Sequence, residues 1–439
     1  MTNRSSNATA AARQRAIVLL PLSKDLVRDP ALRLAEACGL AEALDLDVVR
    51  SDAIPLRRIN PGSFLGGGRV EALKAEAEDQ RIDVIVIDAS LSPVQQRNLE
   101  TGTGAKVIDR TGLILEIFGR RARTREGIVQ VELARLGYER SRLVRTWTHL
   151  ERQRGGLGKT GGPGETQIEL DRRLIAQRID KLKLELEDVR RTRGLQRRAR
   201  RRAGLPAVVL VGYTNAGKSS LFNRLTEAGV FAKDMPFATL DPTARLVRLP
   251  SGRSVIVSDT VGFITDLPTE LVAAFRATLE EVTAADVLVH VRDIAHPETD
   301  SQRDDVLAIL AQLGEKDTAQ PLLVEAWNKI DLLDDIHAAA RRAREEADDV
   351  VVISAKTGEG IDALLAAVER RAFGPTRLKT FTLDPADGRA HAALAARGKV
   401  HEEYIDDAGQ LVMTVELPAD VAAAMEPPVA PVQPRHAAE

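Results

Sequence analysis

Apolar and polar positions follow two different patterns along the first part of the chain. Short, largely apolar runs of the kind that form buried strands occur at 17–20, 46–49, 84–87 and 106–108. Longer stretches with apolar residues at helical spacing occur at 31–43, 69–80, 93–100 and 111–118. Strands that alternate with helices predict a mostly parallel sheet covered by helices. We therefore expect residues 15–120 to form an N-terminal α/β domain.

The next segment, residues 121–204, carries apolar residues at a 4-3 spacing. One repeat contains Val129, Leu133, Leu136, Leu143, Trp147 and Leu150, with Arg140 as its one break, and a second contains Ile168, Ile175, Ile179, Leu182, Leu186 and Val189. Two heptad helices joined by a short segment predict an antiparallel coiled-coil hairpin. The joint, residues 154–164, contains Gly158-Lys159-Thr160, but it is not a second P-loop. No strand precedes it, and Gln153 stands where the first glycine of a P-loop would be.

A third pattern begins at 207–211, an apolar run that predicts a buried strand. It is followed by Gly212-Tyr213-Thr214-Asn215-Ala216-Gly217-Lys218-Ser219 and then by a helical stretch. This is the phosphate-binding motif G-x-x-x-x-G-K-[ST], whose backbone N–H groups and helix N-terminus hold phosphate oxygens. We expect Lys218 to reach the β- and γ-phosphates and the Ser219 hydroxyl to bind Mg²⁺. The alternative is a glycine-rich turn between a strand and a helix.

Two motifs suited to sensing the third phosphate follow the P-loop. The strand-like run 254–258 leads into Asp259-Thr260-Val261-Gly262, where the carboxylate can hold Mg²⁺ through water and the Gly262 N–H can contact the γ-phosphate. Between this motif and the P-loop lies Phe237-Ala238-Thr239-Leu240-Asp241. A threonine there can close over Mg²⁺, and Thr239 is our first candidate, with Thr243 as the second.

Hydrolysis needs a group that orders water or supplies charge, and we assign catalytic roles to Lys218, Thr239, Gly262 and Asn215. Phe263 follows Gly262 at the position where many small GTPases carry a water-orienting glutamine, and phenylalanine can neither donate to water nor accept from it. Intrinsic hydrolysis is therefore expected to be slow. Asn215 can help to hold K⁺ beside the β- and γ-phosphates. The alternative is that Asn215 only stabilises the turn of the loop.

The base is expected to lie against two later motifs. Asn328-Lys329-Ile330-Asp331 follows the apolar run 322–327, and Ser354-Ala355-Lys356 follows 350–353. The Asp331 carboxylate can accept from N1–H and the amine of guanine, a donor pair that adenine lacks. Lys329 can lie along the base, and a backbone N–H of the second motif can meet guanine O6. The ordered set of motifs is typical of a translational-type GTPase that binds GTP or GDP with Mg²⁺.

The remaining segments carry less information. We assign the GTPase domain to residues 205–374, and a strand–helix–strand–strand pattern over 375–420 predicts a small C-terminal α+β domain. Residues 1–14 are polar and alanine-rich and residues 421–439 are proline-rich, so both are expected to be disordered tails. The fold class is thus α/β, with the coiled-coil hairpin between two α/β domains.

Composition narrows the class of protein. Cys38 is the only cysteine, which excludes an intramolecular disulfide and a cysteine zinc cluster. No apolar run approaches the roughly 18 residues of a membrane span, and the N-terminus lacks the apolar core of a signal peptide. We expect a cytoplasmic monomer and leave peripheral membrane association open.

Charge is concentrated in the predicted hairpin. Residues 120–202 contain 24 Lys or Arg and 11 Asp or Glu, whereas the formal charge of the whole chain is −2. A basic arm on an acidic body indicates a local contact with a polyanion, most simply RNA phosphates, although a solvated helix end is the alternative. Few aromatic residues lie nearby, which favours recognition of phosphates and RNA shape over base stacking.

Several strings resemble the HflX family of GTPases, and the resemblance covers roughly residues 15–372. They are residues 91–100, 107–115, 117–118, 121–124, 162–166 and 171–173 together with the reading of the P-loop. The resemblance implies a GTPase that binds the large ribosomal subunit and ribosomal RNA, splits stalled ribosomes under stress, and brings the hairpin tip near the peptidyl transferase centre. The tip carries extra residues around Gly158-Lys159-Thr160-Gly161 compared with that family.

A second function class stays open beside the switch GTPase. The chain could be an RNA-binding scaffold or an ATP-sensing RNA remodeller in which the GTP site is mainly regulatory. The N-terminal domain shows no Walker motif that would support ATP binding there.

Overall fold

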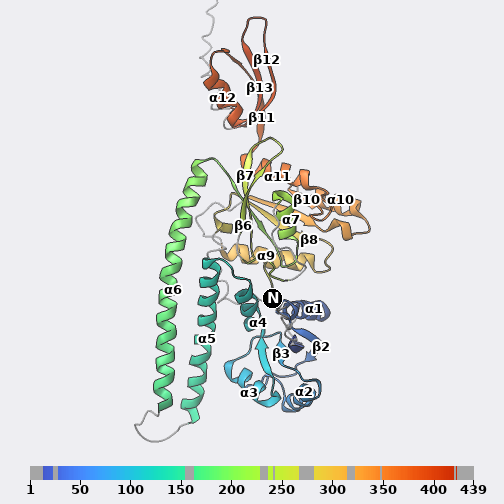
Figure 1. The fold of residues 1–439 in the computed structure, drawn as a ribbon. Helices are drawn as coiled ribbons and strands as arrows, with labels where there is room; N and C mark the ends of the chain where they lie inside the picture. Colours follow the sequence, from blue (N-terminus) through green and yellow to red (C-terminus); the bar gives the residue numbers. More distant parts are fainter. Residues whose placement is uncertain are drawn as a thin grey trace, which may run out of the picture.

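The computed structural model describes residues 13–22, 28–153, 163–227, 236–240, 243–265, 281–313, 322–346, 349–419 and 422. These residues form three sheets and a long helical hairpin (Figure 1). The predicted α/β fold class, with a mostly parallel GTPase sheet, is confirmed. None of the helices in these ranges is long and apolar enough to cross a lipid bilayer.

The N-terminal sheet is parallel throughout and has the strand order β2-β1-β3-β4. Its elements are β1 (Arg15–Leu22), α1 (Pro30–Glu42), β2 (Asp47–Pro55), α2 (Gly67–Gln80), β3 (Val84–Ile87), α3 (Pro93–Thr103), β4 (Lys106–Asp109) and α4 (Arg110–Arg121). All four residues of β3 are buried, because this strand lies in the sheet interior and is covered on both faces. Helix α3 begins with a capping box in which Ser92 and Gln95 bond each other's backbone N–H.

The predicted hairpin is formed by α5 (Arg125–Gln153) and α6 (Pro163–Arg202). Arg125 pairs with Glu185 and Glu132 pairs with Arg178, so the two helices run antiparallel. The predicted heptad residues Val129, Leu182 and Leu186 form their shared core, with Leu133 and Leu136 packed beside it. The side chains of Leu143, Trp147, Leu150 and Ile168, and residues 154–162 of the tip, lie outside the described residues.

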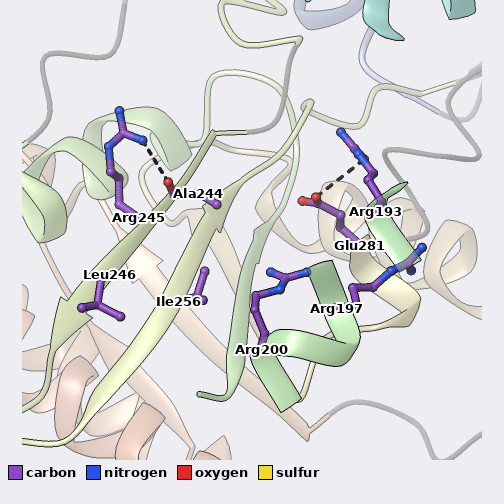
Figure 2. Close-up of a pocket in the computed structure, with 8 residues that line it drawn as sticks. All are labelled: Arg193, Arg197, Arg200, Ala244, Arg245, Leu246, Ile256 and Glu281. Atoms are coloured by element: carbon purple, nitrogen blue, oxygen red, sulfur yellow. Dashed lines mark hydrogen bonds and ion pairs between the residues drawn. The ribbon is translucent and has the colours of Figure 1, made fainter. Parts of the chain in front are cut away.

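Helix α6 continues past the first turn of α5 and reaches the next domain. At this base Arg193 pairs with Glu126 of α5, at 2.8 Å between Nη2 and Oε2. Figure 2 shows its second pair, with Glu281 of the GTPase domain, at 3.6 Å between Nη1 and Oε1. One guanidinium therefore links both helices of the hairpin to the domain that follows.

The GTPase sheet has six strands in the order β10-β9-β8-β5-β7-β6. Its elements are β5 (Ala207–Val211), α7 (Lys218–Thr226), β6 (Thr243–Arg248), β7 (Ser254–Asp259), β8 (Val287–Asp293), α9 (Thr299–Leu313), β9 (Leu322–Asn328), the 3₁₀ turn η1 (Ile330–Leu332), α10 (Ile336–Glu346), β10 (Val350–Val352) and α11 (Ile361–Phe373). Only the edge strand β6 is antiparallel to its neighbour. Ligands of such sheets bind at the carboxyl ends of the strands, and the predicted motifs follow β5, β7, β9 and β10.

The C-terminal sheet has three antiparallel strands, as the strand–helix–strand–strand pattern over 375–420 predicted. It contains β11 (Thr376–Leu383), β12 (Lys399–Ile405) and β13 (Leu411–Pro418), with α12 (Gly388–Arg397) packed against it. Gly409 has φ 77° in the turn between β12 and β13, a conformation that favours glycine. Leu394, Met413, Val415 and Leu417 form its core.

The N-terminal and GTPase sheets share one hydrophobic cluster. It runs from Val18 and Ile114 in the first domain to Val209 and Phe263 in the second. The rings of Phe118 and Phe237 meet edge to face, with 4.6 Å between their centroids. Because Phe237 lies two residues before Thr239, this packing holds the segment on which the candidate Mg²⁺ ligand stands.

Candidate nucleotide-binding site

The P-loop folds as a tight turn between β5 and α7. Asn215 and Gly217 have φ values of 61° and 93°, and Gly217 caps the N-terminus of α7. A Cβ at position 217 would lie 2.2 Å from Nδ2 of Asn328, and this same nitrogen donates to the carbonyl of Ala216 over 2.8 Å. The absence of a side chain at Gly217 therefore lets Asn328, a member of the motif predicted to recognise the base, hold the phosphate loop.

Lys218 is buried within the hollow that the P-loop forms. Its Nζ donates to the carbonyl oxygens of Gly212, over 3.1 Å, and Tyr213, over 2.7 Å. Burial lowers the pKa of Lys218 to about 8, and the carboxylate of Asp259 opposes that shift. A hollow of about 50 Å³ next to it is lined by Thr214, Asn215, Gly217, Lys218, Ser219, Ser220, Phe237, Ala238, Thr239, Thr260 and Gly262.

Three oxygen-bearing side chains meet beside Lys218. The Ser219 hydroxyl lies 2.6 Å from Oδ2 of Asp259 and 2.7 Å from Oγ1 of Thr239. The other carboxylate oxygen of Asp259 is buried and has no hydrogen-bond partner among the described atoms. Hydroxyl and carboxylate oxygens are the donors that Mg²⁺ prefers, so these residues fit that ion. Thr239 is the threonine brought here, whereas Thr243 begins the edge strand β6, and Asp241 lies outside the described residues.

The backbone after Gly262 is bonded to the P-loop. Thr214 N–H donates to the Phe263 carbonyl over 2.7 Å, and Phe263 N–H donates to the Gly212 carbonyl over 3.1 Å. A Cβ on Gly262 would lie 3.0 Å from the Lys218 Nζ and 2.9 Å from the Thr214 Cα. The Phe263 side chain is only 1% exposed and points into the shared core. It cannot touch a water in the hollow beside Lys218, in line with the expectation that Phe263 does not order the attacking water.

The two base motifs lie together at the ends of β9 and β10. Oδ1 of Asp331 accepts from the Ser354 hydroxyl over 2.7 Å, and Oδ1 of Asn328 accepts from the Ala355 N–H over 2.9 Å. Lys329 has φ 67°, and its Nζ pairs with Oδ2 of Asp293 at 2.7 Å. Sequence reasoning missed Asp293. Its place as the last residue of a buried strand could have indicated it, since such carboxylates often face the site.

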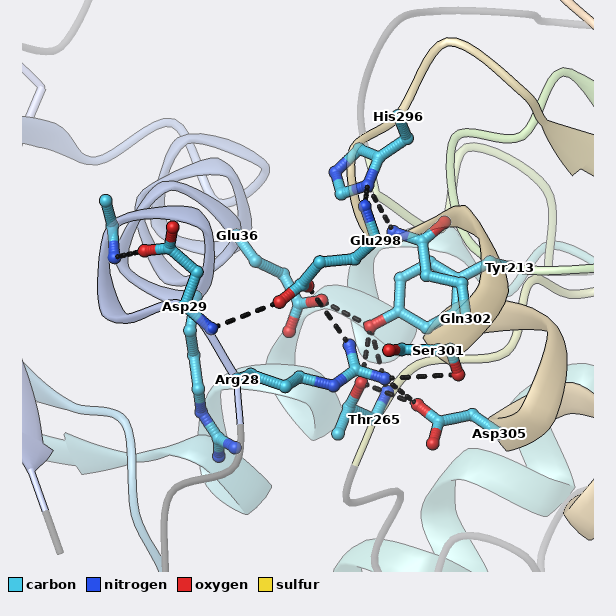
Figure 3. A network of polar contacts seen from close by, with 12 residues as sticks. Arg28, Asp29, Glu36, Tyr213, Thr265, His296, Glu298, Ser301, Gln302 and Asp305 are labelled. Carbon is cyan, nitrogen blue, oxygen red and sulfur yellow. Dashed lines mark hydrogen bonds and ion pairs between the residues drawn. The ribbon is translucent and has the colours of Figure 1, made fainter.

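A polar network that no sequence motif indicated joins the P-loop to the N-terminal domain (Figure 3). The Tyr213 hydroxyl bonds Glu36 of α1 and lies 2.7 Å from Oγ1 of Thr265. Arg110, at the start of α4, donates to the Thr265 carbonyl over 2.9 Å and to Glu36 over 2.6 Å. Burial and the Glu36 carboxylate raise the pKa of Tyr213, so its hydroxyl keeps its proton and donates.

A second set of contacts strengthens the same interface. The Thr265 hydroxyl donates to Asp305 of α9 over 2.9 Å, and Arg28 pairs with Asp305 at 2.5 Å and with Glu298 at 3.7 Å. Thr265 follows Gly262 by three residues, so the segment that is expected to sense the γ-phosphate is bonded on one side to the P-loop and on the other to α4 and α9. The Tyr213 hydroxyl links it further to Glu36 of α1. The N-terminal domain is thus in direct contact with the nucleotide site.

Family models match most of the chain. A model described as "GTP-binding GTPase N-terminal" matches residues 31–119, one described as "GTP-binding GTPase Middle Region" matches 121–200, and one described as "50S ribosome-binding GTPase" matches 207–329.

Individual proteins are similar over nearly the whole chain. A protein named GTPase HflX from Magnetococcus marinus is 51% identical over 396 residues, which covers 90% of each chain. A protein of the same name from Escherichia coli is 44% identical over 359 residues, which covers 82% of this chain and 83% of its own. A solved structure described as an SsGBP and GDP complex is 25% identical with a TM-score of 0.49, and covers 82% of this chain and 98% of its own.

Proposed function

The chain belongs to the HflX family of GTPases, and we propose that it acts as a nucleotide-controlled switch on the large ribosomal subunit. It binds guanine nucleotides and hydrolyses GTP. In our assignment the loop from Gly212 to Ser219 holds the phosphates, Asp331 and the turn from Ser354 to Lys356 recognise guanine, and Ser219 and Thr239 bind Mg²⁺ directly. Asp259 would act on the ion through water.

The observation that supports this assignment is that the residues we assign to the phosphates and those we assign to the base lie at one edge of the sheet. Three oxygen donors meet beside Lys218, and the Asp331–Ser354 pair lies on the loops that follow β9 and β10. Asn328 joins the two halves through its bonds to Ala216 and Ala355. A glycine-rich turn with no ligand gives no reason for the buried Oδ1 of Asp259 to lack a hydrogen-bond partner among the described atoms.

In this proposal, hydrolysis depends on a backbone N–H group and on positive charges beside the phosphates. Mg²⁺, when bound, neutralises charge on the β- and γ-phosphate oxygens. Lys218 adds a positive charge beside these oxygens. Because Gly262 has no Cβ, which would crowd Thr214 and Lys218, its N–H can lie close to the γ-phosphate. The buried Phe263 contributes nothing to the attacking water. Asn215 is held at φ 61° at the mouth of the loop, where its side chain can take part in a K⁺ site.

The ribosomal partner is proposed from three features. One is the match of residues 207–329 to a family described as 50S ribosome-binding GTPases. The second is the name of the relatives. The third is the basic hairpin, whose α5 has 29 residues and so extends roughly 40 Å from the domain it joins. We propose that GTP docks the GTPase domain on the subunit, that docking positions the hairpin tip, and that the tip separates stalled ribosomes.

The domain limits belong to the same proposal. They are an N-terminal domain at 15–120, the hairpin at 121–204, the GTPase domain at 205–374 and the C-terminal domain at 375–420. We further propose that the protein works as a cytoplasmic monomer.

The experiment is sedimentation of ribosomes with the protein and a non-hydrolysable GTP analogue, at several salt concentrations. The test variant replaces residues 154–164 with a short neutral linker, and GDP replaces the analogue as the control for nucleotide state. We expect the variant to keep its GTP affinity, lose ribosome splitting, and bind ribosomes more weakly with a flatter salt dependence. If the variant splits ribosomes as well as the parent at matched GTP and salt, the hairpin is only a spacer. If the parent neither binds nor splits ribosomes with the analogue, the proposed function is wrong.

A further inference from the structure

An arginine in the helix that follows the P-loop contacts the turn that we assign to guanine. Arg224 lies in the last turn of α7, the helix that begins with Lys218. Its Nε donates to the carbonyl of Ala355 over 3.2 Å, and its Nη2 donates to the carbonyl of Lys356. One guanidinium thus bonds two successive carbonyls of a turn that lies far from it in the sequence.

The turn at 354–359 is closed at its ends by bonds of its own. The Ser354 N–H donates to the Glu359 carbonyl over 3.0 Å, and the Ser354 carbonyl accepts from the Gly358 N–H over 2.8 Å. None of the bonds within the turn reaches the two carbonyls that Arg224 contacts, and this arginine is their only donor among the described atoms. The orientation of the peptide groups between the two ends therefore depends on Arg224.

The first contact fixes the direction of a neighbouring N–H group. The Ala355 carbonyl and the Lys356 N–H belong to one peptide unit, which is planar and trans, so the two groups point in opposite directions. Because Arg224 bonds the carbonyl, the Lys356 N–H points away from the guanidinium. This N–H has no hydrogen-bond partner in the part of the chain that the structure describes, and Lys356 is exposed, so the group can donate to a ligand.

The second contact secures the other side of Lys356. Its carbonyl shares a peptide unit with the Thr357 N–H, which donates to the Ser354 hydroxyl oxygen over 3.1 Å. The N–H of Ala355 is already donated to Oδ1 of Asn328. Of the three N–H groups at 354–356, the one on Lys356 is therefore left for the base, and both peptide units beside it are held.

We propose that Arg224 is a positioning residue that aims the Lys356 N–H at O6 of guanine. This inference rests on the proposed assignment of the turn at 354–356 to the base. The O6 atom accepts a hydrogen bond, whereas adenine carries an amine at that position, so a fixed N–H favours guanine. Because α7 also carries Lys218 and Ser219, one helix then contributes to both the phosphate end and the base end of the site.

The test compares the equilibrium affinities for GDP and for 6-thio-GDP, in which sulfur replaces O6. Sulfur is the weaker acceptor, so the ratio of the two affinities reports the bond to this atom. The N1–H and the 2-amine, which are expected to meet Asp331, are present in both nucleotides. IDP, which lacks the 2-amine, reports the contact with Asp331 separately.

Arg224→Ala removes both donors, and Arg224→Lys retains the charge with a single ammonium group. The matched control is Arg248→Ala, since Arg248 also donates to a backbone carbonyl, that of Gly252, over 3.4 Å. That turn precedes β7, whereas Asp259 ends this strand, so the control lies at the opposite edge of the sheet from the nucleotide site.

We expect the parent to bind GDP about tenfold more tightly than 6-thio-GDP, which is the size of one neutral hydrogen bond. Arg224→Ala should weaken GDP about eightfold and 6-thio-GDP less than about twofold, so that the ratio falls to about 2. Arg224→Lys should give a ratio of about 4, because one ammonium can bond only one of the two carbonyls well. The ratio of GDP to IDP affinity should not change, and Arg248→Ala should keep every affinity of the parent.

Hydrolysis supplies a second readout. Loss of a contact with the base removes binding that is equal in the ground state and the transition state, so KM for GTP should rise while kcat stays within about twofold of the parent. Arg224 is an exposed helical position at which alanine is a good helix former, and the thermal unfolding midpoint checks that the variant folds. If it does not fold, Arg224→Met keeps the length of the side chain without its donors, and the same ratio of about 2 is expected.

Equal losses of GDP and 6-thio-GDP affinity in Arg224→Ala would overturn the proposal, because the arginine would then only stabilise the fold. A parent that binds the two nucleotides equally would also overturn it. Failure of the proposed function has a different result, since a parent that binds GDP and ADP equally would remove the base assignment itself. A parent that prefers GDP to ADP, with an unchanged 6-thio-GDP ratio in Arg224→Ala, would defeat the role of Arg224 alone.

Discussion

Replacement of Gly217 by alanine tests whether the base site and the phosphate loop are one mechanical unit. The new Cβ would lie 2.2 Å from the Asn328 Nδ2, so Asn328 or the loop must move. Asn328 is 2% exposed and holds Ala216 at 2.8 Å and Ala355 at 2.9 Å. Loss of its position would disturb the guanine contacts and the phosphate contacts together.

The magnitude follows from two costs. Gly217 has φ 93°, and a residue with a Cβ in the left-handed region costs about 1–2 kcal/mol. A buried polar group left without its partner costs about 1–3 kcal/mol more. Nucleotide binding requires the native loop conformation, so both costs reduce the free energy of binding, by about 2–5 kcal/mol in total. The affinity for GDP should therefore fall by about 30-fold or more.

The assay is the equilibrium affinity for a fluorescent GDP analogue in the presence of Mg²⁺. Gly194→Ala is the matched control, because that helical glycine has no heavy atom within 4 Å of an added Cβ, and its affinity should not change. Asn328→Ala removes the obstacle at position 217. The double variant should then bind only about tenfold more weakly than Asn328→Ala, which is the backbone cost alone. A Gly217→Ala protein that binds GDP within threefold of the parent would refute the reasoning, and so would single losses that add fully in the double variant.

Two further predictions concern the base and the pH dependence of stability. Asp331→Asn should lower the affinity for GTP by about tenfold or more, because charge-assisted hydrogen bonds to guanine contribute roughly 1.5–3 kcal/mol each. The same variant should bind xanthine nucleotides more tightly than the parent does. Equal affinity of the parent for ATP and GTP would contradict this role of Asp331. Burial lowers the pKa of His290 to about 4, so the unfolded chain takes up this proton first, and stability is lost as pH falls from about 6.5 toward 4. Urea unfolding of the parent should show about 2 kcal/mol less stability at pH 5 than at pH 7, and His290→Gln should lack most of that loss; the same loss in both proteins would rule out His290 as its source.

The local sequence was sufficient to predict the nucleotide motifs and most of the elements that carry them. Phosphate binding requires a fixed order of glycines, Lys218 and Ser219 directly after a strand, so the signal is contained in one short stretch. Buried parallel strands such as β3 and β5 are continuous apolar runs, which stand out for the same reason. The antiparallel hairpin followed from its heptads.

The edge strand β6 was not predicted, and its pattern explains why. Of its six residues only Val247 is buried, because a strand at the edge of a sheet has one neighbour and is only partly covered. Its residues therefore lack the apolar run that indicates a central strand.

Contacts between distant segments could be decided only by the tertiary structure. Sequence order left Thr239 and Thr243 as alternatives, and the packing of Phe237 on Phe118 places Thr239 beside Ser219. Tyr213 reads as one variable position of the P-loop, yet its hydroxyl bonds Glu36, 177 residues earlier in the chain. The residues of a local motif are fixed by the ligand that they bind, so the motif can be recognised in a short stretch of sequence. The bond between Tyr213 and Glu36 forms only when two domains bury surfaces against each other, and residue spacing along the chain does not predict which surfaces these are.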